Sequence, residues 1–415
     1  MLFLCGSSVW WRLNKRNLNL DDLNLENLNL DNLNLDEEAI NEILTTMSKF
    51  VRERLVPNEK RVETEGAIPP EILDEMKTIG LFGLTIPEEY GGLGLGMEAE
   101  ARVVIEVSKA APAYRSAFAT TIGIGSQGIV IDGTDAQKER YLPRLATGEI
   151  IGSFALTEPD SGSDAGALKT SAVRDGDGFV INGSKRYITN APVAGVFTVF
   201  ARTNPDEKGS RGVSAFLVDA DNPGLKVGKP DRKMGHHGSL TADVYFDDCR
   251  VTHTALLGRK MEQGFKTAMK VLDRGRLHIA AASVGIAERL IADALSYAMD
   301  RKQFGQPISE FQLIQAMLAD CKTEAYVARC AVLDAAKRRD QGEDITELAS
   351  CCKLFCTEMV GRVADRAVQI HGGAGYISDY MVEQFYRDVR LYRLYEGTSQ
   401  IQQLIIARQM IKRAR

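Results

Sequence analysis

The residues best suited to chemistry lie at positions 395–400, where the chain reads Tyr-Glu-Gly-Thr-Ser-Gln just ahead of its last helical run. Glu396 stands between an aromatic residue and a glycine, with few charges close to it in the sequence, and the glycine allows a turn that can aim the carboxylate. A carboxylate in such a setting is a candidate general base. The plainer interpretation is a surface glutamate that caps the helix starting near Thr398.

Two other segments bear on this choice. Residues 154–164 read Phe-Ala-Leu-Thr-Glu-Pro-Asp-Ser-Gly-Ser-Asp, and residues 369–376 read Gln-Ile-His-Gly-Gly-Ala-Gly-Tyr. Together with 395–400, and in this order, they closely resemble the acyl-CoA dehydrogenase family, and the resemblance extends from about Asp36 to the C-terminus. It implies an α+β fold with an N-terminal helical domain at 36–150, a middle β-barrel-like domain at 151–260 and a C-terminal four-helix bundle at 261–415.

The resemblance also implies an activity, the FAD-dependent α,β-dehydrogenation of an acyl-CoA thioester to the trans-2-enoyl-CoA. Protein side chains cannot accept a hydride, so an organic cofactor has to take the β-hydrogen while a base removes the α-proton. The family has this base at the position of Glu396, where an acyl chain that expels water raises the pKa of a glutamate, about 4.3 when free, toward neutrality. A second branch of the family carries its base on another helix, at about Gly275 here, and the lack of a carboxylate there supports Glu396.

Family members pass their electrons to an electron-transferring flavoprotein, and the resemblance implies a homotetramer with FAD sites at the subunit interfaces. One set of implied FAD contacts lies within a subunit: Phe154, Leu156, Thr157, Tyr187, Thr189, Thr398 and Gln400. A second set reaches the FAD of a neighbouring subunit: Arg301, Phe304, Gln312, Gln369, Gly372 and Gly373. Tyr187, where the family often has tryptophan, shares one face of a predicted strand at 185–190 with Thr189. The alternative to FAD contacts is that these residues are ordinary β-core side chains and polar positions on helix surfaces. That interpretation does not explain the paired glycines.

Substrate contacts are implied at Ser163, Asp273, Arg276, Gly397 and Arg115. Ser163 falls where the family contacts the pantetheine and pyrophosphate region of CoA. Asp273 and Arg276 match positions near the CoA moiety, and Arg276 is expected to help bind its adenosine part. The alternative for these two residues is an ion pair on a helix surface.

Arg115 bears on the identity of the acyl group. It lies at 112–117, where the family builds the far end of the acyl pocket, and glutaryl-CoA dehydrogenases carry a similar Tyr-Arg-Ser-Ala whose arginine meets the distal carboxylate of the substrate. The acidic residue that accompanies that arginine corresponds here to Ser108. We therefore expect a short to medium, simple or branched acyl group. A dicarboxylic acyl-CoA is the alternative substrate, and a surface or interface ion pair is the plain alternative for Arg115.

The composition excludes several other classes. The 51 lysines and arginines against 56 acidic residues, net charge −5, create no global basic field for nucleic acid or an anionic membrane. The seven cysteines are odd in number and read as free thiols in a reducing compartment; Cys351, Cys352 and Cys356 lack nearby histidines, so we expect no metal. Residues 1–11 make a poor signal peptide, and no stretch reads as a membrane helix, so we expect a cytoplasmic location if the source is bacterial.

The periodicity of apolar residues divides the chain into a repeat, two helical parts and a β-rich part between them. Leucine recurs every five residues over 18–35 among Asn, Asp and Glu, which predicts disorder, a loosely attached arm or a translated upstream DNA repeat over residues 1–35. Helical periodicity starts at Asp36 and returns after Gly264. Between them the sequence predicts strands at 178–183, 196–201, 213–218 and 243–246. Glycines at 91–96 do not follow a strand, so they predict a loop and no dinucleotide site.

Two other functions are alternatives. An acyl-CoA oxidase would differ in oxygen access, which a sequence does not display. Some family relatives act on or bind nucleic acid, and that alternative requires a basic C-terminal surface and a dispensable base. Lys412, Arg413 and Arg415 are basic, but such short tails are usually solvated, and the segment around Glu396 is intact. We therefore expect no nucleic-acid partner.

Overall fold

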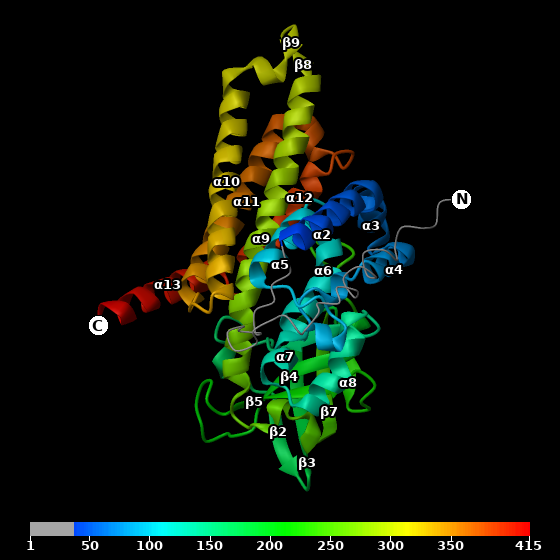
Figure 1. The fold of residues 1–415 in the computed structure, drawn as a ribbon, viewed down its shortest axis with the longest axis vertical. Helices are drawn as coiled ribbons and strands as arrows, with labels where there is room; N and C mark the ends of the chain where they lie inside the picture. Colours follow the sequence, from blue (N-terminus) through cyan, green and yellow to red (C-terminus); the bar gives the residue numbers. More distant parts are fainter. Residues whose placement is uncertain (1–36) are drawn as a thin grey trace, which may run out of the picture. The chain divides into compact units, whose positions relative to one another are not determined.

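The computed structural model describes residues 37–415, in which helices precede and follow a seven-stranded β-sheet (Figure 1). The five-residue repeat at 18–35 lies outside the described residues. The strands of the large sheet gather at the lower end of the view, the long helices of the C-terminal part extend upward from them, and a small two-stranded hairpin lies at the top. The predicted α+β class, with helical, β and helical parts in that order, is confirmed.

The helical part before the sheet is built from short helices. Their bounds are α2 Glu37–Phe50, α3 Glu59–Glu65, α4 Pro70–Thr78, α5 Met97–Val107, α6 Pro112–Thr120, α7 Gln127–Asp132 and α8 Asp135–Ala146. Local signals explain several ends: Pro70 and Pro112 occupy first turns, where a missing N–H costs nothing, and Thr134 and Gln137 form a capping box before α8. The glycines at 91–96 lie in a loop before α5, as predicted.

The sheet has seven strands in the order β1-β4-β2-β3-β7-β6, with β5 paired to β4. The bounds are β1 Gly152–Ala155, β2 Ser171–Asp175, β3 Gly178–Thr189, β4 Val196–Arg202, β5 Val213–Asp219, β6 Leu225–Val227 and β7 Thr241–Thr252. Strands β4 and β5 are buried along almost their whole length, which fits their continuous apolar sequences.

The predicted strand at 185–190 is the second half of β3 and not a separate strand. Its pairing with β7 shifts register between Lys185 and Ile188, and Tyr187 has a φ of 58°. This is a β-bulge, which bends the strand and re-aims the side chain. Simple alternation therefore does not describe how Tyr187 and Thr189 are presented.

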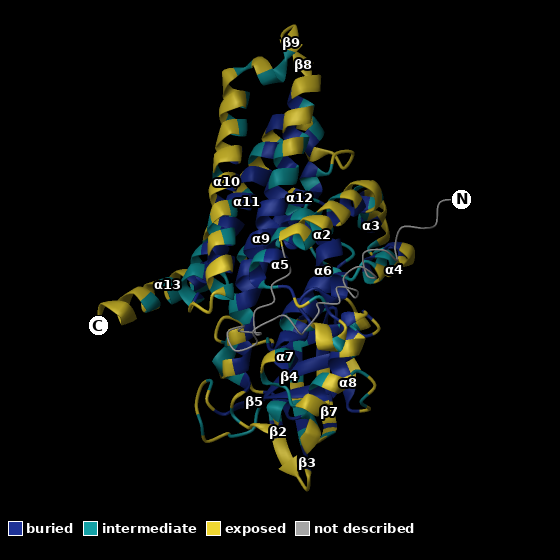
Figure 2. Ribbon diagram, viewed as in Figure 1, coloured by how far each residue is buried: buried dark blue, intermediate teal, exposed yellow. Residues whose placement is uncertain are grey.

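Long helices form the C-terminal part. Their bounds are α9 Gly264–Asp300, α10 Gln312–Asp340, α11 Thr346–His371, α12 Val382–Val389 and α13 Ser399–Ala414, with a small hairpin of β8 Lys302–Gln303 and β9 Gln306–Pro307 between α9 and α10. Small buried side chains along the middle of α9, including the run from Ala280 to Ala282, let α10, α11 and α5 pack closely against it. Figure 2 shows this buried stretch of α9 flanked by helices with exposed outer faces.

Of the cysteines within residues 37–415, Cys330 is exposed, Cys351 is half-buried, and Cys249, Cys321, Cys352 and Cys356 are buried. Cys352 and Cys356 are buried in α11, and burial raises the pKa of Cys352 to about 12. Within residues 37–415 no cluster of metal-ligating side chains is present. In the same range, no helix combines the length and apolar character needed to cross a membrane.

Candidate active site

Glu396 lies in a tight turn that connects the 3-10 segment Arg390–Arg393 to α13. Its φ is 56°, and that of Gly397 is 86°, so two consecutive residues occupy the left-handed region that costs energy for a residue with a side chain. Gln402 Nε2 donates to the carbonyl oxygens of Glu396 (3.1 Å) and Gly397 (2.9 Å). Lys353 Nζ also donates to the Gly397 carbonyl, at 2.7 Å. The Thr398 hydroxyl accepts from Ile401 N (3.2 Å) and caps α13.

The Glu396 carboxylate is shielded and poorly satisfied. Its Oε2 has no solvent exposure and no hydrogen-bond partner within residues 37–415. A Cβ placed on Gly275 of α9 would lie 2.7 Å from this oxygen, so the carboxylate packs directly against the glycine. Burial raises the pKa of Glu396, and the positive charges of Arg276, Lys353 and Arg115 oppose that rise. Glu396 is therefore not an exposed helix cap but a desolvated carboxylate, the state that a general base near neutral pH requires.

A cavity of about 760 Å³ opens beside this carboxylate. It brings together sequence-predicted residues from the sheet, α9 and the turn before α13: Phe154, Leu156, Thr157, Ser163, Tyr187, Thr189, Arg276, Glu396 and Gly397. These residues are separated by up to about 240 positions, and only the fold makes them neighbours. Thr398 and Gln400 follow directly on the turn that supplies Glu396, at the start of α13.

The cavity has the size and lining that a flavin ring requires. Its volume falls in the usual range for ligand sites, roughly 300–1,000 Å³. Phe154 and Leu156 give it apolar walls, and Thr157 and Thr189 line it with hydroxyl groups. Tyr187, re-aimed by the bulge, keeps 61% of its surface exposed at the cavity, with Arg186 stacked on its ring at 4.8 Å. The residues present therefore fit a flat aromatic group bound near Glu396.

Asp273 and Arg276 form an ion pair on α9, one turn apart. Arg276 is 95% buried and faces the cavity, and Asp273 also accepts a hydrogen bond from the Thr346 hydroxyl at 3.1 Å. The alternative of an ion pair on an exposed helix surface is therefore wrong for Arg276. Its guanidinium Nε has no partner within residues 37–415, which leaves a donor free for a bound group.

A smaller cavity of about 70 Å³ continues from Glu396 and Tyr395 toward α6. Polar side chains form one wall of it, which includes Arg115, Ser116, Lys233, His236, Arg274 and His278. Arg115 is 95% buried, donates to the Tyr395 hydroxyl (3.2 Å) and to Ser116 Oγ (3.3 Å), and lies over the Tyr392 ring. Its Nε has no partner, and it forms no ion pair with any residue of 37–415. Arg115 therefore forms no surface ion pair within residues 37–415, and the interface ion pair stays an alternative.

Sequence reasoning missed part of this polar wall. Glu100 of α5 is fully buried and pairs with Arg274 and with His278 Nδ1 (2.8 Å), both on α9. These residues occupy inward positions of two long helices, where a sequence pattern predicts apolar side chains. A charged residue breaking the apolar face of 97–107 is the only signal, and it does not name its partners.

The second set of predicted FAD contacts does not line the cavity beside Glu396. Arg301 ends α9, Phe304 lies in the β8–β9 hairpin with 94% of its surface exposed, and Gln312 starts α10. Gln369 lies in the last turn of α11, Gly372 and Gly373 directly follow that helix, and Arg301 faces a separate cavity there beside His371. Within one chain, the predicted contacts thus form two groups that do not meet.

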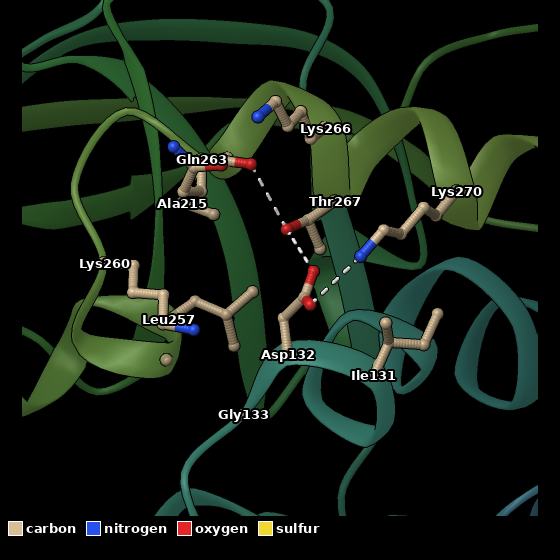
Figure 3. Close-up of a pocket in the computed structure, with 12 residues that line it drawn as sticks. Ile131, Asp132, Gly133, Ala215, Leu257, Lys260, Gln263, Lys266, Thr267 and Lys270 are labelled. Atoms are coloured by element: carbon tan, nitrogen blue, oxygen red, sulfur yellow. Dashed lines mark hydrogen bonds and ion pairs between the residues drawn. The ribbon is translucent and has the colours of Figure 1, made fainter.

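Another cavity, of about 380 Å³, lies between the end of α7 and the start of α9 (Figure 3). Lys270 pairs with Asp132 at 3.3 Å, and the Thr267 hydroxyl donates to the same carboxylate at 2.6 Å. None of the sequence-predicted site residues lines it. Phe265, Met269 and Leu272 on the other face of α9 line the large cavity instead, so the first turns of α9 separate the two.

The chain was compared with known proteins. Three models match it in sequence order: the acyl-CoA dehydrogenase N-terminal domain at 37–149, the middle domain at 153–249 and the C-terminal domain at 262–411. The chain is 44% identical over 363 residues to the probable acyl-CoA dehydrogenase YngJ of Bacillus subtilis, covering 88% of this chain and 95% of the relative.

Two more similarities bear on partners and substrate. The chain is 40% identical over 382 residues to the caffeyl-CoA reductase-Etf complex subunit CarC of Acetobacterium woodii, covering 90% of this chain and 98% of the relative. The solved structure of butyryl-CoA dehydrogenase from Megasphaera elsdenii superimposes with a TM-score of 0.87 at 35% identity, covering 92% of this chain and all of that one.

Proposed function

Because the chain belongs to the acyl-CoA dehydrogenase family, we propose that it removes the α and β hydrogens of a short acyl-CoA thioester, with Glu396 as the base and FAD as the cofactor. It is an oxidoreductase that acts on CH–CH groups. The observation that carries the proposal is the shielded, unpartnered carboxylate of Glu396 at the junction of the large cavity and the small one.

FAD, when bound, supplies the acceptor for the β-hydride. Phe154, Thr157, Tyr187 and Thr189 of the large cavity are proposed to hold its ring, and Arg276 to contact the CoA moiety. Glu396 takes the α-proton onto its carboxylate. Its desolvation raises the proton affinity of that carboxylate, and its left-handed backbone turns the side chain toward the cavities instead of along α13.

The small cavity supports a short acyl chain. Its volume of about 70 Å³ is roughly half of the ~150 Å³ that holds a benzene molecule in an engineered protein cavity. A chain of a few carbons fits such a space, whereas a long fatty acyl chain does not. One structural neighbour, at 35% identity, is named butyryl-CoA dehydrogenase.

For the electron acceptor we propose an electron-transferring flavoprotein, supported by the relative named as a subunit of a reductase-Etf complex. We also propose a homotetramer in which Arg301, Gln369 and Gly373 contact the FAD of a neighbouring subunit. The placement of these residues away from their own cavity, together with the exposed Phe304 at the hairpin, supports this arrangement.

The test is anaerobic bleaching of the FAD-loaded protein by a panel of acyl-CoAs with butyryl, isobutyryl, octanoyl and glutaryl groups. We expect bleaching by a short-chain member and slow or no bleaching by octanoyl-CoA. The proposed dehydrogenase activity is excluded if the flavin stays oxidised with every member, and the short-chain preference is excluded if octanoyl-CoA bleaches it fastest.

A second candidate substrate, a dicarboxylic acyl-CoA, is favoured by Arg115. A buried guanidinium without a carboxylate partner is costly, and a distal substrate carboxylate entering the small cavity would supply the missing charge. Against it, Ser108 stands where the glutaryl-specific branch has an acidic residue. The Arg115→Met variant separates the two: glutaryl-CoA bleaching should fall at least tenfold relative to butyryl-CoA bleaching if Arg115 binds the carboxylate, and the ratio should stay constant if it does not.

A further inference from the structure

Two side chains donate hydrogen bonds to the backbone of the turn that presents Glu396. Glu396 and Gly397 both have positive φ values, a conformation that persists only where neighbouring groups stabilise it. Gln402, from the first turn of α13, bonds both carbonyl groups of the turn and belongs to the same local segment. Lys353 is the other donor, and it comes from α11, 43 to 44 positions earlier in the chain.

The surroundings of Lys353 are unusual for a lysine. Its side chain is completely buried, and its only hydrogen bond within residues 37–415 goes to the neutral carbonyl oxygen of Gly397. Desolvation lowers the pKa of Lys353 to about 8. Buried ammonium groups normally pair with a carboxylate, because leaving a buried charge unpaired is strongly destabilising. A methionine or leucine would fill the same space in α11 at a lower cost.

The charge that Lys353 does approach is that of the turn. The negative charge of Glu396 is the strongest influence that favours the ammonium form of Lys353, and the positive charge of Lys353 in turn favours the ionised form of Glu396. The two groups thus compensate each other across the turn without forming a direct ion pair. The two residues lie 43 positions apart in the sequence, and neither residue type predicts this relation.

We propose that Lys353 is a positioning residue that fixes the turn carrying Glu396 and supplies a positive charge to that turn. The inference rests on the proposed role of Glu396 as the base. Through its bond to the Gly397 carbonyl, Lys353 ties the turn to α11, the helix that packs most extensively against α9. Gly275, which the Glu396 carboxylate contacts, belongs to α9. Through its charge, it offsets part of the desolvation that the carboxylate experiences.

Other charged and titratable groups also face Glu396. Arg276 approaches from α9 and Arg115 from α6, and both are arginines that stay charged throughout the working pH range. The further titratable neighbours are Tyr392 and Tyr395 on its own segment, Glu358 on α11, which pairs with Arg393, and His236 and His278 on the walls of the small cavity. Lys233 and the Glu100–Arg274 pair also line the small cavity, but Lys353 is the lysine whose charge acts on Glu396 within the described residues.

The experiment compares the wild type with Lys353→Met and Lys353→Arg, all as FAD-loaded protein. Stopped-flow flavin bleaching by butyryl-CoA, or by the panel member that works best, is recorded as a function of pH. We expect the acid limb to move upward by about one pH unit in Lys353→Met, a tenfold loss on the acid side, because the ionised base loses a nearby opposite charge. Lys353→Arg keeps the charge and should return the limb to the wild-type position. Lys322→Met removes an exposed lysine from α10 and serves as the matched control, with no shift expected.

A second readout does not depend on turnover. Infrared difference titration follows the protonated carboxyl band of Glu396, assigned by its loss in Glu396→Gln, and the midpoint of that band should rise in Lys353→Met alone. If Lys353→Met does not retain FAD, Lys353→Gln, which is polar and neutral, replaces it in both measurements. Slower bleaching with an unmoved acid limb and an unmoved band would show a merely structural lysine and overturn the inference. A wild type that no acyl-CoA bleaches would overturn the proposed function instead, and the band would still decide whether Lys353 controls Glu396.

Discussion

Adding one methyl group to Gly275 should disable the site while leaving the fold intact. In the structure, a Cβ at this position would lie 2.7 Å from Glu396 Oε2 and 3.1 Å from its Cδ, whereas ordinary contact starts at 3.4 Å. The carboxylate therefore has to retreat by about 0.7 Å, the difference between 3.4 and 2.7 Å. A displacement of about 1 Å in a reacting group can cost on the order of a hundredfold in rate. We predict that Gly275→Ala slows flavin bleaching by about 10- to 100-fold.

The assay is stopped-flow bleaching of FAD-loaded Gly275→Ala by butyryl-CoA, with thermal unfolding measured on the same sample. Gly275 has a normal helical backbone within α9, and alanine is a better helix former by about 1 kcal/mol, so the melting temperature should not fall. Gly128→Ala in α7 is the matched control, because its new methyl group would meet only side-chain atoms at 3.6 and 3.7 Å. Wild-type bleaching by Gly275→Ala would refute the inferred contact between the glycine and the carboxylate.

The turn and its surroundings give three further predictions. Gly397→Ala should lower the bleaching rate and destabilise the protein by about 1–2 kcal/mol, measured by chemical denaturation, because the left-handed backbone disfavours a Cβ, which would also lie 2.7 Å from Gln402 Nε2. Glu100→Gln should lower the unfolding free energy by about 3–5 kcal/mol, since it leaves Arg274 buried without its carboxylate; an unchanged melting temperature would contradict this. Burial raises the pKa of Glu396 in the folded state above the value of about 4.3 in the unfolded state. The folded wild type therefore loses stability relative to Glu396→Gln as pH rises through this range. Chemical denaturation should show a larger stability advantage of Glu396→Gln at pH 8 than at pH 5.

Much of the architecture could be predicted from periodicity and turn signals. Helical repeats, prolines in first turns and short β-rich segments indicated the order of helices and strands, and the observed bounds of β4 and β5 differ from the expected ones by a single residue. The long β3 was harder, because the bulge at Tyr187 breaks the alternation that defines a strand in sequence. A bulge depends on the register of the neighbouring strand, which no local pattern contains.

The site was predictable only in part. The motif at 395–400 drew attention to Glu396, and the family resemblance indicated its neighbours in the large cavity. The polar wall formed by Glu100, Arg274 and His278 and the support from Lys353 were not predicted, since each is a charged residue at an inward helical position whose partner lies far away in the chain. Their significance comes from burial and pairing, which are properties of the packed structure.

The most direct measurement is anaerobic single-turnover bleaching of FAD-loaded Glu396→Gln beside the wild type, using the acyl-CoA that the wild type accepts best. The amide keeps the shape of the side chain but cannot take the α-proton. We predict that the variant still binds the acyl-CoA, which is seen as a perturbation of the flavin spectrum. Bleaching should slow by about a thousandfold or more, because larger general-base contributions are on the order of 10³–10⁴ in rate. Bleaching at close to the wild-type rate by a well-folded Glu396→Gln protein would show that another group removes the proton.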